Sequence, residues 1–383
     1  MKKSPNTLIG ERLREARRCM GLTLREVAEK MGFASYQTLS SIESGEREIR
    51  AWELAKLGRI YHRDINYFLF EEQETKPFEV LWRKKSESPE VKSYERRFVR
   101  FCENYACVEK LSGSKPPESL DRLKYNKEDF SFSFAKRLAD RHSAILKLGR
   151  RPACSLARVL GEIFAVKILC LQMGKEGSAA STWGLFGPAI LLNADEVPWR
   201  RNFSLAHELF HLLTVDIFNA EEIYHFSTGE KSKVEQFADV FASTLLLPRE
   251  EVRQEFEAHI RNGKIRYLDC VEIAGKFEVS TEALLWSLVD LRLVKPEEAR
   301  RVLDAPELKS VDPRLPFSDL KQVSEFPDRY VKIAFRCMQL GQISRGKFAE
   351  FMEIDRQQIP IFLSRYGLDE DKDYSFELLT SRR

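Results

Sequence analysis

Residues 203–213 read Phe-Ser-Leu-Ala-His-Glu-Leu-Phe-His-Leu-Leu, with two histidines four residues apart and a glutamate directly after the first. Residues four apart share one face of a helix, so the spacing predicts that His207 and His211 bind one metal ion together. Apart from them and Glu208, the residues from Leu205 to Leu213 are apolar, which indicates a buried helix. Burying two imidazoles and a carboxylate without partners costs free energy, and a bound metal ion would be a partner for them. The alternative is a pair of core histidines satisfied by hydrogen bonds.

A second run, residues 234–248, offers a third ligand. It reads Val-Glu-Gln-Phe-Ala-Asp-Val-Phe-Ala-Ser-Thr-Leu-Leu-Leu-Pro, a helical pattern whose apolar face leaves Glu235 and Asp239 together on another side. A catalytic zinc usually keeps three protein ligands and one position open for water, and Glu235 is the candidate for the third. Asp239 is then placed to accept a hydrogen bond from a ligand histidine, which fixes the tautomer of that histidine and raises its basicity. The alternative is a solvated acidic stripe.

These two runs resemble the ImmA/IrrE family of bacterial metallopeptidases. The likeness is most specific from Arg200 to Pro248 and extends more loosely from Leu81 to Arg301. It implies a zinc-dependent metalloendopeptidase. The zinc ligands would be His207, His211 and Glu235, and the catalytic base would be Glu208. Asp239 stands where the family often has asparagine. Manganese suits the same ligands, although zinc is favoured by affinity.

The chemistry implied by this resemblance is peptide hydrolysis. Zinc lowers the pKa of a bound water to about 7 and polarises the peptide carbonyl, while Glu208 takes the proton of the attacking water and returns it to the leaving amine. A strand expected at Ala189 to Leu192, ending at Asn193, is a candidate edge for main-chain pairing with an extended substrate. Tyr224 and His225 lie between the two metal-binding runs and are candidates for the cleft, with a place on the surface as the alternative for His225.

The N-terminal 70 residues carry a helix-turn-helix pattern. Leu22 to Gly32, followed by Thr38 to Gly45, has the order of helix, glycine turn and second helix. This segment resembles the XRE (Cro/C1-like) family, which implies a DNA-binding domain whose second helix enters the major groove. Four side chains are candidates for contacts with base edges: Ser35, Tyr36, Gln37 and Ser40. Gln37 is suited to a bidentate pair with adenine. Residues 1–70 hold 13 Lys or Arg against 9 Asp or Glu, a local excess that favours phosphate contact.

The segment departs from the XRE pattern in two places. Leu24 stands where the family usually has glutamine, and one extra residue lies between Gly32 and the second helix. Both departures put a phosphate contact in question, so the alternative is a helical protein-interaction module on the same fold. DNA binding by this fold usually works in pairs, and a homodimer is therefore expected.

The periodicity of apolar residues and the positions of helix-breaking residues divide the chain of 383 residues into four parts. We expect a mainly α protein with a five-helix helix-turn-helix domain over residues 1–70, a charged linker over 71–89, an α+β gluzincin-like metallopeptidase domain with a small sheet over 90–303, and a helical C-terminal region over 304–383. The five N-terminal helices are expected at Leu8–Cys19, Leu24–Met31, Tyr36–Ser44, Ile49–Tyr61 and Ile65–Leu69. Two strands are expected at Ala165–Leu171 and Ala189–Leu192, and a loop around Ser112–Pro117.

The C-terminal region contains another pattern of helix, turn and helix. Residues 343–360 read Ile-Ser-Arg-Gly-Lys-Phe-Ala-Glu-Phe-Met-Glu-Ile-Asp-Arg-Gln-Gln-Ile-Pro. Pro360 is expected inside the second helix, which weakens an interpretation as a DNA-binding element. A docking or oligomerisation element is therefore favoured over a second helix-turn-helix.

Composition narrows the class of protein. A net charge of +3, from 62 basic and 59 acidic residues, is too balanced to indicate nucleic-acid binding by itself. Seven scattered cysteines are read as free thiols rather than a disulfide framework. The sequence contains no apolar run of 18 residues and no secretory leader, so we expect a cytoplasmic protein without membrane segments.

Together these features predict a regulatory protease that binds DNA, or a partner on DNA, and cleaves one specific protein such as a transcriptional repressor or an antitoxin. This expectation follows the analogy with ImmA/IrrE family members that destroy a repressor. The alternative is a transcriptional regulator with a structural or sensory metal site and no proteolysis. A structural zinc site has no use for Glu208, which favours the protease. The resemblance also allows a component of a toxin–antitoxin or phage-regulation operon.

Overall fold

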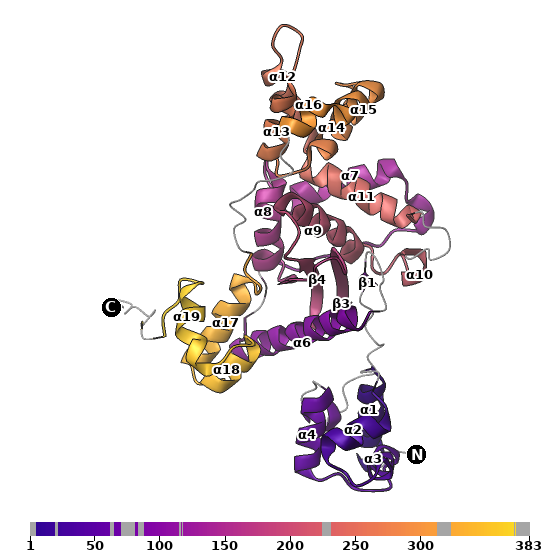
Figure 1. Ribbon diagram of the computed structural model, residues 1–383, viewed down its shortest axis with the longest axis vertical. Helices are drawn as coiled ribbons and strands as arrows, with labels where there is room; N and C mark the ends of the chain where they lie inside the picture. The colour runs from indigo at the N-terminus through magenta and orange to yellow at the C-terminus, as the bar shows by residue number, and fades with distance from the viewer. Residues whose placement is uncertain are drawn as a thin grey trace, which may run out of the picture. The chain divides into compact units, whose positions relative to one another are not determined.

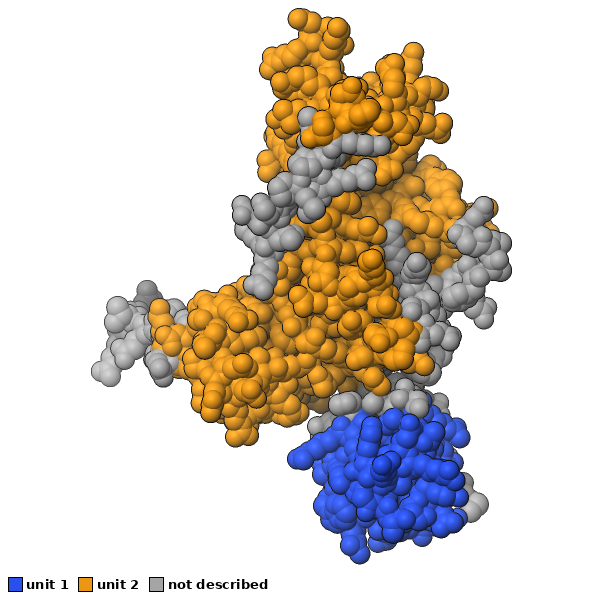
Figure 2. Space-filling view, in the orientation of Figure 1, with its two compact units in different colours: residues 1–77 blue, residues 78–383 orange. Residues whose placement is uncertain are grey.

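The computed structural model describes most of the chain, namely residues 5–19, 22–61, 65–69, 81–82, 88–114, 116, 118–223, 231–311, 323–370 and 372. Contacts divide the chain into two compact units, residues 1–77 and residues 78–383 (Figure 2). The protein is mainly α with one small sheet, which confirms the expected fold class. Within the described parts of the chain, no helix is both long and apolar enough to cross a membrane.

The described residues of the first unit form five helices. They are α1 (Pro5–Cys19), α2 (Leu24–Met31), α3 (Tyr36–Ser44), α4 (Ala51–Tyr61) and α5 (Ile65–Leu69). A capping box begins α2: Thr23 accepts a hydrogen bond from the backbone N–H of Glu26, whose carboxylate accepts one from the backbone N–H of Thr23. The helix ends at Gly32, whose φ of 77° is a left-handed conformation that glycine adopts without strain. These local signals produce the turn that separates α2 from α3.

The core of the first unit is apolar, and an ion pair with a buried carboxylate joins two of the helices around it. Its fully buried side chains include Leu13, Val27, Leu39 and Leu57. Glu43 of α3 is 2% exposed and accepts hydrogen bonds from two nitrogens of Arg17 of α1, at 2.7 and 2.8 Å. Because a buried charge without its partner is costly, this pair holds α1 and α3 in one orientation.

Among the described residues of the second unit, the sheet has four strands in the order β1-β3-β4-β2. The strands are β1 (Leu81–Trp82), β2 (Lys167–Leu171), β3 (Ala179–Gly184) and β4 (Gly187–Asn193). β4 pairs with β3 in the antiparallel and with β2 in the parallel direction, whereas β1 pairs with the outer edge of β3. Side chains alternate between two cores, so that Ile190 and Leu192 lie in one and Ala189 and Leu191 in the other.

Two of these strands correspond to sequence expectations and two do not. β2 and β4 coincide with the runs expected at Ala165–Leu171 and Ala189–Leu192. β3 reads Ala-Ala-Ser-Thr-Trp-Gly and has few of the branched apolar residues by which a strand is recognised. β1 falls within residues 71–89, the stretch expected to be a linker, so part of that stretch belongs to the sheet.

One face of the sheet is covered by a helical layer that contains both candidate metal-binding runs (Figure 1). Its principal helices are α7 (Phe132–Ile145), α8 (Pro152–Arg158), α9 (Pro198–Leu213) and α11 (Lys233–Leu246). α9 contacts β3 and β4, and α11 contacts both α9 and α7. The layer continues in α10 (Ala220–Ile223), α12 (Arg249–His259), α13 (Tyr267–Lys276), α14 (Thr281–Asp290), α15 (Pro296–Asp304) and α16 (Pro306–Val311), and a π-helical turn follows α8 at Val159–Ile163.

The opposite face of the sheet packs against the first helix of the second unit and the C-terminal helices. These are α6 (Pro89–Ser112), α17 (Asp328–Gln339), α18 (Arg345–Phe351) and α19 (Ile359–Ser364), with a 3₁₀ turn at Arg356–Gln358. The loop expected around Ser112–Pro117 is longer than expected, because the described residues from 113 to 131 form only a 3₁₀ turn at Lys127–Asp129. Pro360 does not interrupt a helix, since it lies in the first turn of α19, where no N–H is needed.

A buried ionic cluster joins the C-terminal helices to the sheet. Glu109 of α6 contacts Lys167 of β2 at 2.9 Å and also pairs with Arg329 of α17. Arg329 in turn donates to the Tyr105 hydroxyl at 3.1 Å. The Lys167 side chain is 3% exposed, so it depends on Glu109 for its charge balance. The C-terminal helices therefore share a core with the rest of the second unit.

Candidate metal centre

The helix α9 carries His207, Glu208 and His211 through the middle of the second unit. Pro198 in its first turn needs no N–H partner and starts the helix. Every residue from Ser204 to Leu213 is buried, because the sheet lies on one side and α11 on another. The buried helix expected from residues 203–213 is thus present.

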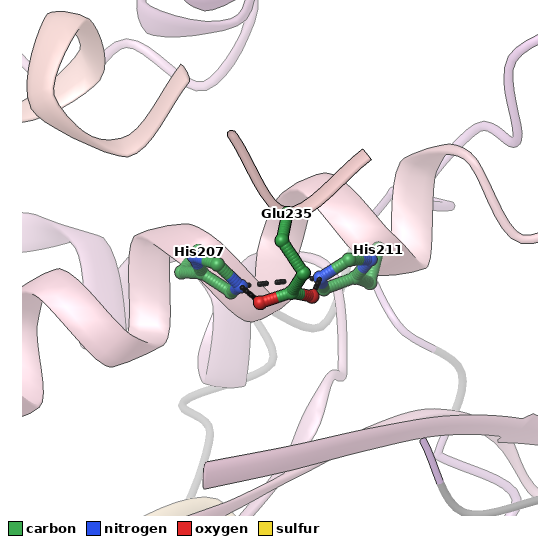
Figure 3. Close-up of side chains that lie close together, drawn as sticks. All are labelled: His207, His211 and Glu235. Atoms are coloured by element: carbon green, nitrogen blue, oxygen red, sulfur yellow. Dashed lines mark hydrogen bonds and ion pairs between the residues drawn. The ribbon is translucent and has the colours of Figure 1, made fainter. Parts of the chain in front are cut away.

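Three side chains from α9 and α11 converge on one point (Figure 3). The Nε2 atoms of His207 and His211 are 3.2 Å apart. The Glu235 carboxylate faces both: one oxygen is 3.3 Å from His207 Nε2 and the other is 3.0 Å from His211 Nε2. Ser232 caps α11 by accepting a hydrogen bond from the Glu235 N–H at 3.1 Å, which places this glutamate in the first turn.

The donor set fits a divalent cation. Two ligands held about 2.1 Å from a tetrahedral ion stand about 3.4 Å apart, and imidazole nitrogen with carboxylate oxygen is a usual zinc donor set. The separations of 3.0, 3.2 and 3.3 Å between the three groups are close to that spacing. Within the described ranges, no other group of three His, Cys, Asp or Glu side chains meets in this way. The residues can therefore hold one ion with a coordination position left for a further ligand.

Asp239, one turn after Glu235 on α11, lies behind His207. Its Oδ1 is 3.0 Å from His207 Nδ1, and its other oxygen pairs with Lys231. A proton on Nδ1 donated to Asp239 leaves the lone pair of Nε2 directed toward Glu235 and His211. Asp239 and His207 are thus in the relative positions expected from the sequence.

Electrostatics at the site follow from burial and these contacts. Burial lowers the pKa of His207, but its hydrogen bonds to Asp239 and Glu235 outweigh burial, and the pKa is raised. Burial raises the pKa of the Glu235 carboxyl, but its contacts with His207 and His211 prevail and lower it. Without a cation, these contacts therefore favour the protonated form of His207 and the ionised form of Glu235.

Glu208 lies beside this group and is held by a residue that the sequence does not reveal. Its Oε2 accepts a hydrogen bond from the hydroxyl of Ser181 on β3 at 2.6 Å. Its Oε1 is buried and has no hydrogen-bond partner in the described parts of the chain. Ser181 carries no motif, and its strand was not apparent in the sequence, so only the fold identifies it.

The expected pairing of a substrate with β4 is wrong. Both edges of β4 are occupied, by β3 on one side and β2 on the other, so its main chain has no free hydrogen-bonding edge. Asn193 stabilises a loop, because its Oδ1 accepts from the N–H of Met173 and its Nδ2 donates to the Gly174 carbonyl. The other two cleft candidates, Tyr224 and His225, lie outside the described residues.

The candidate DNA contacts gather at the beginning of α3. Ser35 is the N-cap and accepts from the Gln37 N–H at 3.2 Å. Tyr36 is 41% exposed, and the guanidinium of Arg25 on α2 lies 5.6 Å from the centre of its ring. Gln37 is also exposed, whereas Ser40 is half-buried. Arg25 is an addition to the sequence candidates, since an exposed cation at this end of the helix pair is suited to phosphate contact.

Comparison with protein families identifies two domains. Residues 162–288 match the peptidase M78 family, described as an IrrE N-terminal-like domain, and residues 8–66 match a helix-turn-helix domain. The chain therefore joins a DNA-binding type of helix-turn-helix domain to a metallopeptidase-type domain of the ImmA/IrrE kind, which confirms both resemblances. No curated protein matches the sequence.

Proposed function

We propose that this protein is a DNA-binding regulatory zinc metalloendopeptidase. The observation that carries the proposal is the convergence of His207, His211 and Glu235 from two helices, with Glu208 next to His207 on α9. Three ligands and an adjacent carboxylate are the parts that hydrolysis by a metal site requires. Manganese suits the same donors, but zinc binds them more tightly.

Each residue of the centre has a separate task. His207, His211 and Glu235 would hold the ion, which when bound would supply an acidified water and polarise the peptide carbonyl. Glu208 accepts the proton of the attacking water on Oε1 and delivers it to the nitrogen of the leaving amine. Asp239 keeps the Nδ1 proton on His207, so that Nε2 remains a donor to the ion.

The substrate is proposed to be one specific protein, such as a transcriptional repressor or an antitoxin. The support is the helix-turn-helix domain over residues 8–66. A domain of this type would tether the peptidase to DNA and raise its concentration near proteins bound there. Residues 1–70 contact DNA through α3 in this proposal, with Ser35, Tyr36, Gln37 and Ser40 at the base edges, and a homodimer covers two half-sites. A protein with these partners acts in the cytoplasm.

A second candidate is a transcriptional regulator whose metal site is structural or sensory. It is favoured by the depth of the site, since His207, Glu208 and His211 are 0%, 1% and 3% exposed. It leaves Glu208 without a task, and for that reason we prefer the peptidase.

The variant Glu208→Gln separates the two candidates. It keeps the shape of the side chain and removes the base, so metal content and DNA binding should match the wild type while cleavage of the cellular target disappears. Metal content is measured by mass spectrometry of the purified full-length protein, and cleavage by comparing new protein N-termini in cells that express either form. Persistence of the same new N-termini in Glu208→Gln cells would refute the peptidase, and a wild type without bound metal would refute both candidates.

A further inference from the structure

Ser181 is a buried hydroxyl that contacts Glu208 and that the proposed chemistry leaves without a role. It is 1% exposed, and its Oγ lies 2.6 Å from Glu208 Oε2. We infer that Ser181 is the positioning residue for the base: it fixes one oxygen of Glu208 so that the other points to the attacking water. This inference rests on the proposed function and names a further residue of the same site.

The hydrogen bond has a defined direction. A serine hydroxyl donates to a carboxylate, and a length of 2.6 Å is typical of a charge-assisted bond. Oε2 is thereby engaged, whereas Oε1 is buried with no hydrogen-bond partner in the part of the chain that the structure describes. A general base needs one oxygen within reach of the proton that it accepts, and here Oε1 is the oxygen left for that purpose.

β3 leaves Ser181 little freedom to move. Its backbone is paired on both sides, with Ile190 of β4 and Leu81 of β1. Alternation along β3 places Ala179 in the core that contains α9 and Ala180 in the core on the other face, so Ser181 points to α9. Only the side-chain torsion of Ser181 remains to be set, and the bond to Glu208 sets it. A base held by a paired strand does not have to be reoriented when substrate arrives.

Proton transfer does not pass through Ser181. The proton of the attacking water moves to Glu208 Oε1 and from there to the leaving amine, while the Ser181 proton stays on its own oxygen throughout. Removing the hydroxyl therefore leaves the metal ligands intact and frees Glu208 to adopt other side-chain torsions. A purely structural role would instead lower stability and leave the presentation of Oε1 unchanged.

The test uses a probe that needs no knowledge of the substrate. Acetohydroxamic acid chelates an active-site ion and passes its hydroxyl proton to the neighbouring base, so its affinity reports the orientation of Glu208. The full-length protein is loaded with cobalt(II), and the dissociation constant is measured from the visible spectrum. Metal content and Tm are recorded for every variant.

Ser181→Ala should bind cobalt stoichiometrically and bind acetohydroxamate about tenfold more weakly, because a charge-assisted hydrogen bond to the base is lost. Ser181→Thr keeps a hydroxyl and should restore affinity. Ser181→Cys has similar volume but a weak donor, so it should resemble Ser181→Ala even if the alanine variant folds poorly. Ser204→Ala is the matched control, since Ser204 is a fully buried serine of α9 whose Oγ hydrogen-bonds Glu196 instead.

The outcomes distinguish this inference from the proposed function. Wild-type affinity in both Ser181→Ala and Ser181→Cys, together with loss of affinity in Glu208→Gln, overturns the role of Ser181 and leaves the peptidase standing. An equal loss in Ser204→Ala also overturns it, because the effect is then general to the buried site. Failure of the wild type to take up metal overturns the proposed function itself.

Discussion

Asp239 Oδ1 lies 3.0 Å from His207 Nδ1, and this contact joins the two helices that carry the proposed metal ligands. Because α11 also carries Glu235, a single helix supplies both a ligand and the partner of another ligand. The position of α11 against α9 therefore determines the ligand distances and the tautomer of His207 together. Metal affinity should depend on both.

Replacing Asp239 by alanine should weaken zinc binding roughly 10- to 100-fold, because His207 loses the acceptor that fixes its tautomer. Asp239→Asn should lose much less, since the amide oxygen still accepts from Nδ1. The zinc dissociation constant is measured by competition with a chromophoric chelator. Lys231→Ala serves as a control, because its side chain is 54% exposed and pairs with the other Asp239 oxygen, which does not face His207 Nδ1. Equal zinc affinity in Asp239→Ala and the wild type would show that the contact is incidental.

Zinc affinity should fall as pH decreases. The pKa of His207 in the metal-free protein is raised from its ordinary value of 6.5, so a proton must leave the ring before Nε2 binds the ion. Above the raised pKa the affinity is constant, and below it each pH unit lowers affinity about tenfold for one displaced proton. Glu235 stays ionised, because its pKa is lowered.

Calorimetry in buffers of different ionisation enthalpy measures the protons released when zinc binds.

The raised pKa of His207 has a second consequence, because a pKa that is higher in the folded than in the unfolded state stabilises the metal-free fold. That stability is complete below the pKa of the unfolded chain and is lost as pH rises through the raised value. Affinity that does not change with pH, with no proton release, is incompatible with this account.

Gln37→Ala should weaken binding to a cognate DNA site by about 1–3 kcal/mol, the usual value of a bidentate base contact. The site is first selected from random duplexes with the wild type, and affinities are then compared by fluorescence anisotropy at constant salt. Trp52→Ala is the control, since Trp52 is 53% exposed but lies on α4. If both variants bind like the wild type, and Tyr36→Ala does too, α3 does not read bases.

The C-terminal helices should be required for the stability of the second unit. Tyr330 of α17 is fully buried, and its ring centre lies 4.9 Å from that of Tyr105 and 5.2 Å from that of Phe101. Tyr330→Ala should lower the free energy of unfolding by roughly 3–5 kcal/mol, as for other large core aromatics. Ile361 is 65% exposed on α19, so Ile361→Ala should change it by less than about 0.5 kcal/mol. Denaturant unfolding of the full chain compares the two variants with the wild type. Equal unfolding midpoints for Tyr330→Ala and the wild type would mean that the packing of α17 is dispensable for stability.

Much of the site was predictable because its signals are local in sequence. His207, Glu208 and His211 share one helical run, and helix periodicity alone places both histidines on one face. Glu235 was predictable less directly, from a second run whose apolar face left it free. The boundaries of α2 and α3 likewise follow from a capping box at Thr23 and a left-handed glycine at position 32.

Only the tertiary structure decided which strands pair and what surrounds the base. Strand partners come from segments far apart in the chain, so the sequence of β4 cannot show that both its edges are occupied, nor that β1 from the expected linker pairs with β3. The sequence does not reveal the role of Ser181 either, because this residue lies 27 positions from Glu208 and contacts it only in the folded sheet. The sequence by itself placed the two histidines of the proposed metal site on one helix face, through the period of a helix. The fold determined how the side chains around Glu208 are oriented, because hydrogen bonds between distant strands and packing against α9 have no local signature in the sequence.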